Sequence, residues 1–442
     1  ARIMVDTSIV KECRGTIGGG FQLTEKSNMQ AKDLTVFNCT SNRGGGIIVE
    51  KSSKVSLSTC QVSSNRAKEG GGICLRDGGQ LISFNSTRVE HNYASNQGGG
   101  IVVISEGHAR LDDTFVEHNL AYYGGGMYVD GCSVEARSTS LSSNSVESGG
   151  YGGGLFMAKN GYALFERSIL GRNIATKGGA AYIEYGSLLH IRKTTLQHNQ
   201  AKYDGGGVFV NDAIALLQDS IVEENLAVDE GGGLNVQNGG NMTALDTMFL
   251  RNSVGGEEGT GSGIGSIVVL GRSTSGSAVR CFFDSNVALN TGGFYATEAV
   301  VNIEESTFTF NTAKEGAGLV LDRTSVAMLS TTTWSHNRAS ESGAGVVVRG
   351  EALATVSECV FGPNNVAVQV GGGLLVDKLC KVVMKKSIVK SNIATAGAGI
   401  RVQGKAKLIM MDSEVSKNQA REGAGISAVD ISHLDIQDSI FV

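Results

Sequence analysis

Apolar and polar residues alternate in short stretches that recur along the whole chain. In one such unit, Ile47 and Val49 follow a triplet of small residues, and Val55 and Leu57 follow a polar turn. A third stretch ends at Val62, three positions before an asparagine. Alternation with a single apolar face is typical of a half-buried β-strand. Each unit therefore predicts three short strands separated by turns.

These units repeat at a nearly constant interval. The small-residue triplets run from Gly18 to Gly423, which is 405 residues in fifteen intervals, a mean of 27. Three short strands cannot bury their apolar faces within one unit, so successive units must stack in parallel. We predict an all-β fold, a right-handed single-stranded parallel β-helix of about 16 rungs with three strands per rung. Residues 1–442 are expected to form one such solenoid. The period does not suit leucine-rich, helical or propeller repeats.

Two residue types mark the turns. A glycine triplet fits a sharp corner with positive φ, where stacked Cβ atoms would collide. The recurrent asparagine fits a ladder in which each side-chain amide bonds the amides of the turns before and after it. The predicted ladder residues are Asn65, Asn92, Asn119, Asn173, Asn199, Asn225, Asn286, Asn311, Asn337, Asn392 and Asn418.

Composition and charge narrow the class of protein. Glycine accounts for 62 of 442 residues, proline occurs once, and hydrophobic residues make up 41%. No apolar run is long enough for a membrane span. The net charge is −5 and both signs alternate along the chain, so we expect no nucleic-acid partner. No cofactor is expected.

The two ends of the chain suggest a segment of something longer. The sequence opens at Ala1 without a signal peptide, and neither end has an amphipathic helix or a polar cap. Solenoids need caps to cover an exposed sheet edge. We therefore expect a segment of a longer chain, uncapped at both ends, or copies that associate end to end or with other subunits of a surface assembly.

The repeats resemble those of the chlamydial polymorphic membrane proteins. The resemblance lies in an apolar residue three before an asparagine, followed by a glycine-rich triplet and an aliphatic residue, as in TFTFNTAKEGAGLVL (Thr307 to Leu321) and CFFDSNVALNTGGFY (Cys281 to Tyr295). Elsewhere Val or Leu replaces the phenylalanine, and the family's GGA triplet occurs once, at Gly178 to Ala180. The resemblance implies secretion, a β-helical stalk, and adhesion or surface assembly.

An enzyme is the main alternative, because parallel β-helices also host pectate lyases and tailspike hydrolases. Glycosidases need two carboxylates on one groove, and lyases need an acidic calcium site with a basic residue nearby. Here the acids are scattered, and the adjacent Asp112 and Asp113 are predicted to point to opposite faces. We therefore predict no catalytic residues. The alternative that stays open is a pectate lyase-like or tailspike-like enzyme acting on polysaccharide.

Three smaller groups of residues are candidate sites. The pair Glu90 and His91 recurs one rung later as Glu117 and His118. These four residues are weak candidates for a metal site, although other rungs carry varied residues at the histidine position, which indicates that it is exposed and permissive. Cys13 and Cys39 also share a phase, which makes a disulfide possible, with stacked free thiols as the alternative. The sequons at Asn38, Asn85 and Asn241 are glycosylation candidates, although chance alone predicts about as many.

Two glycine- and serine-rich insertions, from Ser253 to Thr260 and from Arg272 to Ser277, interrupt the period. Insertions often carry the binding surface of a solenoid, although a relaxed turn is the simpler explanation. Together these features predict an extracellular or cell-surface protein with a structural or adhesive role, such as a stalk or filament segment. A glycan or a host protein is its expected ligand.

Overall fold

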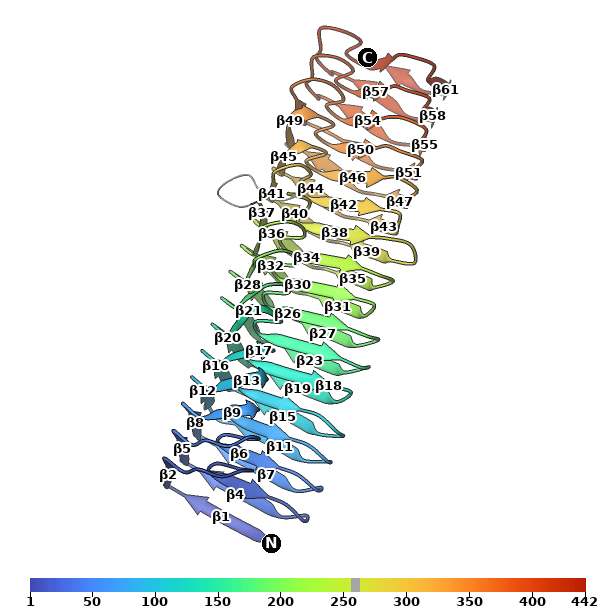
Figure 1. The fold of residues 1–442 in the computed structure, drawn as a ribbon. Helices are drawn as coiled ribbons and strands as arrows, with labels where there is room; N and C mark the ends of the chain where they lie inside the picture. Colours follow the sequence, from blue (N-terminus) through green and yellow to red (C-terminus); the bar gives the residue numbers. More distant parts are fainter. Residues whose placement is uncertain (256–262) are drawn as a thin grey trace. The chain divides into compact units, whose positions relative to one another are not determined.

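The computed structural model describes residues 1–255 and 263–442 and divides into two compact units, residues 1–221 and 222–442. Every regular element in the described residues is a β-strand, and the strands of successive turns pair in parallel within each unit (Figure 1). Strands at equivalent positions of successive turns form four sheets, which we call A to D. Sheet A holds nine strands in the first unit and eight in the second, which makes about 17 turns. The predicted fold class is therefore confirmed, with one turn more than the sequence suggested.

In each turn the chain passes through strands of sheets A, B and D, which are the three predicted strands. Most turns add a short fourth strand, in sheet C, between the ladder asparagine and the glycine corner. Most of these strands bury a single alanine, as at Ala94 and Ala121, so they show no apolar alternation. One strand, β32 (Ile221–Glu223), spans the point at which the two units divide.

In the first unit, sheet A contains β1 (Arg2–Asp6), β4 (Asn28–Lys32), β7 (Lys54–Ser58), β11 (Gln80–Phe84), β15 (His108–Asp112), β19 (Ser133–Arg137), β23 (Tyr162–Glu166), β27 (Leu188–Arg192) and β31 (Ile214–Gln218). Sheet B contains β2 (Ile9–Lys11), β5 (Thr35–Phe37), β8 (Gln61–Ser63), β12 (Thr87–Glu90), β16 (Thr114–Glu117), β20 (Ser140–Ser142), β24 (Ile169–Gly171) and β28 (Thr195–Gln197). Sheet C contains β9 (Arg66–Glu69), β13 (Tyr93–Gln97), β17 (Leu120–Tyr123), β21 (Ser145–Tyr151), β25 (Ile174–Ala175) and β29 (Gln200–Ala201). Sheet D contains β3 (Phe21–Leu23), β6 (Ile47–Val49), β10 (Ile73–Leu75), β14 (Ile101–Val103), β18 (Met127–Asp130), β22 (Leu155–Ala158), β26 (Ala181–Glu184) and β30 (Val208–Asn211).

In the second unit, sheet A contains β35 (Asn241–Leu245), β39 (Ser275–Val279), β43 (Val300–Glu304), β47 (Val326–Ser330), β51 (Leu353–Ser357), β55 (Lys381–Lys385), β58 (Lys407–Met411) and β61 (His433–Gln437). Sheet B contains β36 (Met248–Leu250), β40 (Phe282–Asp284), β44 (Thr307–Thr309), β48 (Thr333–Ser335), β52 (Val360–Phe361), β56 (Ile388–Lys390), β59 (Glu414–Ser416) and β62 (Ile440–Phe441). Sheet C contains β33 (Leu226–Ala227), β37 (Ser253–Val254), β41 (Val287–Ala288), β45 (Thr312–Glu315), β49 (Arg338–Ser342) and β53 (Val366–Ala367). Sheet D contains β34 (Leu234–Gln237), β38 (Ile267–Leu270), β42 (Phe294–Thr297), β46 (Leu319–Asp322), β50 (Val346–Val348), β54 (Leu374–Val376), β57 (Ile400–Val402) and β60 (Ile426–Ala428).

The glycine triplet forms the corner between sheets C and D. Gly44 has a φ of 61°, which glycine adopts without a steric penalty. A Cβ on the next residue, Gly45, would lie 2.3 Å from the carbonyl oxygen of Gly71 in the following turn. The corner thus combines a left-handed backbone with close contact between turns, and both demands favour glycine.

Asparagine amides form a buried row in each unit. The side chain of Asn92 donates to the carbonyl of Val62 in the preceding turn and to Oδ1 of Asn119 in the next, while its own Oδ1 accepts from the backbone and side-chain nitrogens of Asn65. The amide-to-amide distances are 2.9–3.2 Å. Beside the predicted residues, the rows include Asn144, Asn252 and Asn365.

The residue before each ladder asparagine is left-handed. Ser64, His91 and Phe310 have φ values of 55°, 56° and 53°, and the same holds at this phase in the other turns. Such a conformation costs a non-glycine residue about 1 kcal/mol or more. Since these side chains range from serine to phenylalanine, the turn is imposed by the stacking and the asparagine bonds, not by the residue itself.

The interior is filled by rows of equivalent side chains. In the second unit a buried aromatic stack lies three residues before the asparagine, or four before Asn365, with ring centroids 4.2–5.6 Å apart. Its members are Phe249, Phe283, Phe308, Trp334 and Phe361. In the first unit the same position holds aliphatic residues such as Val62 and Val89. The same asparagine motif is therefore combined with aliphatic packing in the first unit and with aromatic packing in the second.

Replacing one ladder amide is expected to destabilise the chain. Asn119→Ala leaves the nitrogens of Asn92 and the carbonyl of Val89 without their buried partner, so we expect a loss of about 3 kcal/mol. The measurement is the guanidinium midpoint of unfolding. The exposed Asn42→Ala serves as the control and should cost less than about 0.5 kcal/mol. Equal shifts for the two variants would refute a structural role for the ladder.

Candidate functional site

The two histidines of the proposed metal site stack, but their glutamates face elsewhere. The rings of His91 and His118 lie 4.9 Å apart with an interplanar angle of 5°. Arg88 instead holds both carboxylates, at 2.8 Å from Glu90 and 3.2 Å from Glu117. Burial by itself raises the pKa of Glu90, but the hydrogen bonds from Arg88 and the amide of Gln61 lower it below its usual value. Within residues 1–255 and 263–442, no three metal-ligating side chains form a group that could hold an ion.

The other candidate residues differ in their exposure. Cys13 and Cys39 are free thiols in the structure. Asn38 and Asn85 occupy exposed left-handed turns, whereas Asn241 is half-buried in β35 and bonds the hydroxyl of Ser275. The insertion from Ser253 to Thr260 falls largely outside the described residues. The stretch from Arg272 to Ser277 is a turn that leads into β39.

A row of aromatic side chains lies on the outer face of sheet D in the first unit. Tyr128, Phe156, Tyr182 and Phe209 stack with centroids 5.0–5.3 Å apart and interplanar angles of 5–7°. Tyrosines of sheet C cover them from across the glycine corner, with Tyr123 5.2 Å from Phe156 and Tyr151 5.0 Å from Tyr182. We call these six residues the aromatic corner. They are spaced 26 to 28 residues apart within each row, so aligning the repeats would have revealed them.

A cavity of about 270 Å³ opens on the aromatic corner. Its lining residues are Gln97, Tyr123, Tyr128, Tyr151, Phe156, Ala158, Lys159, Glu184 and Tyr185. The hydroxyl of Tyr182 donates to Glu184 at 3.2 Å, and Lys159 pairs with Asp130 at 2.7 Å. Burial raises the pKa of the Glu184 carboxyl, and that of the Tyr182 hydroxyl as well. The cavity therefore combines rigid rings with a carboxyl that ionises less readily than usual.

The second unit has a cavity at the same corner, of about 260 Å³. Tyr295 stands at the phase of Tyr182 and donates to Asp322 at 3.3 Å. Arg349 bridges Asp322 at 3.0 Å and Glu315 at 2.6 Å. Here a fixed guanidinium with two carboxylates replaces the stacked rings.

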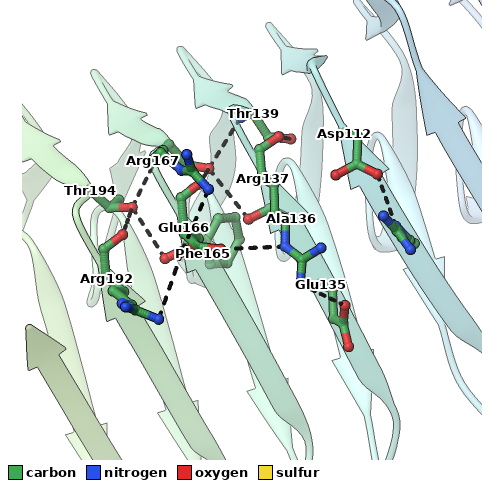
Figure 2. A network of polar contacts seen from close by, with 12 residues as sticks. Asp112, Glu135, Ala136, Arg137, Thr139, Phe165, Glu166, Arg167, Arg192 and Thr194 are labelled. Carbon is green, nitrogen blue, oxygen red and sulfur yellow. Dashed lines mark hydrogen bonds and ion pairs between the residues drawn. The ribbon is translucent and has the colours of Figure 1, made fainter.

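Figure 2 shows a polar network on the outer face of sheet A in the first unit. Arg137, Arg167 and Arg192 converge on the single carboxylate of Glu166, at 3.4, 3.9 and 3.8 Å. Parallel pairing aligns Arg137 of β19, Glu166 of β23 and Arg192 of β27 across three strands. These positions are 29 and 26 residues apart, so their meeting becomes visible only when the strand register is known.

Native thiol reactivity provides a first test of the cysteines. Seven of the eight are buried, and burial raises the pKa of Cys74 and Cys380 to about 12. A buried, protonated thiol reacts slowly. We expect a chromogenic disulfide reagent to titrate one thiol, Cys13, in the folded protein and eight after denaturation. A Cys13–Cys39 bridge would instead give none in the folded protein and six after denaturation without reductant.

The Glu184 carboxyl predicts a pH effect on stability. Because burial raises its pKa, the folded protein binds this proton more tightly than the unfolded chain does. The resulting stabilisation is present below the ordinary pKa of a glutamate and is lost as the pH rises through the raised value. The melting temperature of Glu184→Gln should therefore equal that of the parent at about pH 4 and exceed it at about pH 7. The exposed Glu351→Gln is the control, and a Glu184→Gln difference that does not change with pH would refute the effect.

Comparison with known proteins bears on the fold. No curated protein sequence matches the chain. Among solved structures, the PL6 family alginate lyase AlyGC matches at 8% identity and a TM-score of 0.18, with 100% of this chain and 97% of that chain covered. A mutant of that lyase matches at 9% identity and a TM-score of 0.17, with 100% and 96% covered. A likeness this weak supports no conclusion about this chain.

The family comparison is more informative. The family described as "Right handed beta helix region" matches residues 81–254 and 265–441, which is most of the chain. The matched residues lie in both units, where strands of successive turns pair in parallel. In the residues that the structure describes, no helix is long and apolar enough to cross a membrane. The chain belongs to the right-handed β-helix family.

Proposed function

We propose that this protein is an extracellular or cell-surface β-helix with a structural or adhesive role, and that the aromatic corner is its contact surface. The observation that carries the proposal is the cavity at this corner, where Tyr123 and Tyr151 are half-buried, Tyr185 is exposed, and the stacked rings beneath them are buried. Tyrosine side chains supply large contact areas, and side chains that already pack against other rings lose little conformational freedom on binding. Tyrosine hydroxyls and Glu184 at the cavity add hydrogen-bonding groups that a glycan or a host protein would match.

The repeat pattern supports the same role. It resembles the repeats of chlamydial polymorphic membrane proteins, for which secretion and adhesion are expected. A solenoid whose turns follow one register also suits a stalk or filament segment, which would associate with further copies or with other surface subunits. Sedimentation velocity over a concentration series tests this part, and a monomer at every concentration would count against self-association.

Adhesion through the aromatic corner predicts a binding defect in a matched pair of variants. We expect the double variant Tyr151→Ala, Tyr185→Ala to bind at least about tenfold more weakly to whichever ligand of a glycan and matrix-protein panel the parent binds. Tyr185 is more than half exposed and lines the cavity, so its loss should not unfold the chain. Tyr203→Ala, an exposed tyrosine that does not line the cavity, is the control. Saturable binding that the double variant retains in full would contradict the proposal.

A carbohydrate-active enzyme is the second candidate, favoured by one observation. Burial raises the pKa of the Glu184 carboxyl at the cavity, and a raised pKa is what a general acid requires. Incubation with neutral polysaccharides and with polyuronates, with and without calcium, tests this candidate. New chain ends formed by the parent but not by Glu184→Gln would establish an enzyme and displace the adhesive proposal.

A further inference from the structure

The outer face of sheet A in the first unit carries more guanidinium donors than its carboxylates can accept. Arg137, Arg167 and Arg192 together offer fifteen N–H groups, five on each side chain. Glu166 has about four acceptor positions, and Glu135 adds a contact 3.7 Å from Arg137. We call the three arginines with Glu166 the guanidinium cluster.

The contacts within the guanidinium cluster are loose. Charge-assisted hydrogen bonds between arginine and carboxylate measure about 2.7–2.9 Å, whereas the three distances to Glu166 run from 3.4 to 3.9 Å. Nε of Arg137 lies within ion-pair distance of Glu166 but outside hydrogen-bond geometry, so this buried N–H has no hydrogen-bond partner. A buried donor without a partner is costly, so Glu166 satisfies Arg137 incompletely.

The charges around the cluster favour an anion. The sheet A strands β19, β23 and β27 and the residues that directly follow them carry four basic side chains, Arg137, Arg167, Arg192 and Lys193, and two acidic ones, Glu135 and Glu166, a balance of +2. On one side Arg110 neutralises Asp112 at 2.9 Å, and Asp113 accepts from the backbone and hydroxyl of Ser86. On the other side the nearest acidic group is Asp219, one turn beyond Lys193.

The side chains around the guanidinium cluster indicate which kind of molecule would bear the anionic group. Tyr162, Leu164 and Leu188 lie half-buried on the same outer face, along the strands that hold Glu166 and Arg192. Arg137 and Arg192 align two strands apart, about 9.6 Å along the stacking direction, with Glu166 between them. This spacing suits a linear polymer with regularly spaced charges. Sugar rings have apolar faces that such side chains can contact, and the planar fork of arginine matches a carboxylate or a sulfate ester.

We propose that the guanidinium cluster binds the anionic groups of an acidic polysaccharide. The arginines donate to a carboxylate or sulfate ester of the polymer, and the row of Tyr162, Leu164 and Leu188 contacts its sugar rings. This site goes beyond the aromatic corner, because it lies on sheet A and recognises charge. Its success or failure is therefore independent of the adhesive role proposed for that corner.

The test uses the full chain and four probes: heparin, polygalacturonate, neutral dextran and inorganic sulfate. At low ionic strength we expect saturable binding of heparin or polygalacturonate, weakened by added salt, and no binding of dextran. The double variant Arg167→Gln, Arg192→Gln removes two exposed charges and should lower the affinity at least about tenfold. Comparing heparin with polygalacturonate identifies a sulfate ester or a carboxylate as the preferred group.

Arg280→Gln is a matched control. Arg280 occupies the same position in its repeat as Arg167, with the same φ of 50°, but its guanidinium forms a bidentate pair with Asp246 at 2.8 and 3.0 Å. We expect this variant to bind the polymer as the parent does. An equal loss in Arg280→Gln would show that general surface charge, and not the cluster, attracts the polymer, and would overturn the proposal.

Glu166→Gln separates binding from folding. Removing the shared carboxylate frees guanidinium donors and raises the local charge, so we expect the affinity for the polymer to increase several-fold, an outcome that a folding defect does not produce. A decrease in affinity, binding of inorganic sulfate without either polymer, or no binding of any polyanion at low salt would each overturn the proposal.

Discussion

Stacking in register is the constraint on which the rest of this structure depends. Each turn must place its polar backbone groups and its buried side chains directly above those of the turn before. The asparagine row satisfies this demand most fully, because each interior amide uses both of its N–H groups and accepts two more hydrogen bonds. A shift of one residue would separate these amides and move apolar side chains from the interior to the surface. The glycine corner adds the same restriction through close contact between turns.

Much of the fold could be predicted, because the constraint leaves a periodic trace in the sequence. Asparagine, glycine and alternating aliphatic residues recur at the mean interval, and each has a direct physical role. The short strands of sheet C were harder to predict, since most of them bury a single alanine, such as Ala94 or Ala121, and show no apolar alternation. The left-handed residue before each asparagine was equally hidden. Phe310 and Ser64 share this conformation, and neither residue type marks it.

The sites were harder to predict, for a geometric reason. Surface chemistry in a solenoid comes from residues of different turns, whose separation in sequence varies with turn length. Arg137, Glu166 and Arg192 meet because their strands pair in parallel, and the chain shows no local motif there. The sequence places His91 next to Glu90, but Arg88 attracts the carboxylates of both Glu90 and Glu117. The position of a residue within its repeat identifies its neighbours in adjacent turns but does not determine which charges form ion pairs.

The asparagine row has an electrical consequence. Every side-chain amide in it points the same way, with Nδ2 directed toward Oδ1 of the next turn, so the amide dipoles add along the stack. Aligned hydrogen bonds polarise one another, which strengthens each by an estimated ~10–30%. An amide in the middle of the row is therefore held more firmly than one at either end. Replacing a central member divides one polarised chain of amides into two shorter ones. The loss of stability should therefore exceed that for an end member with the same local contacts.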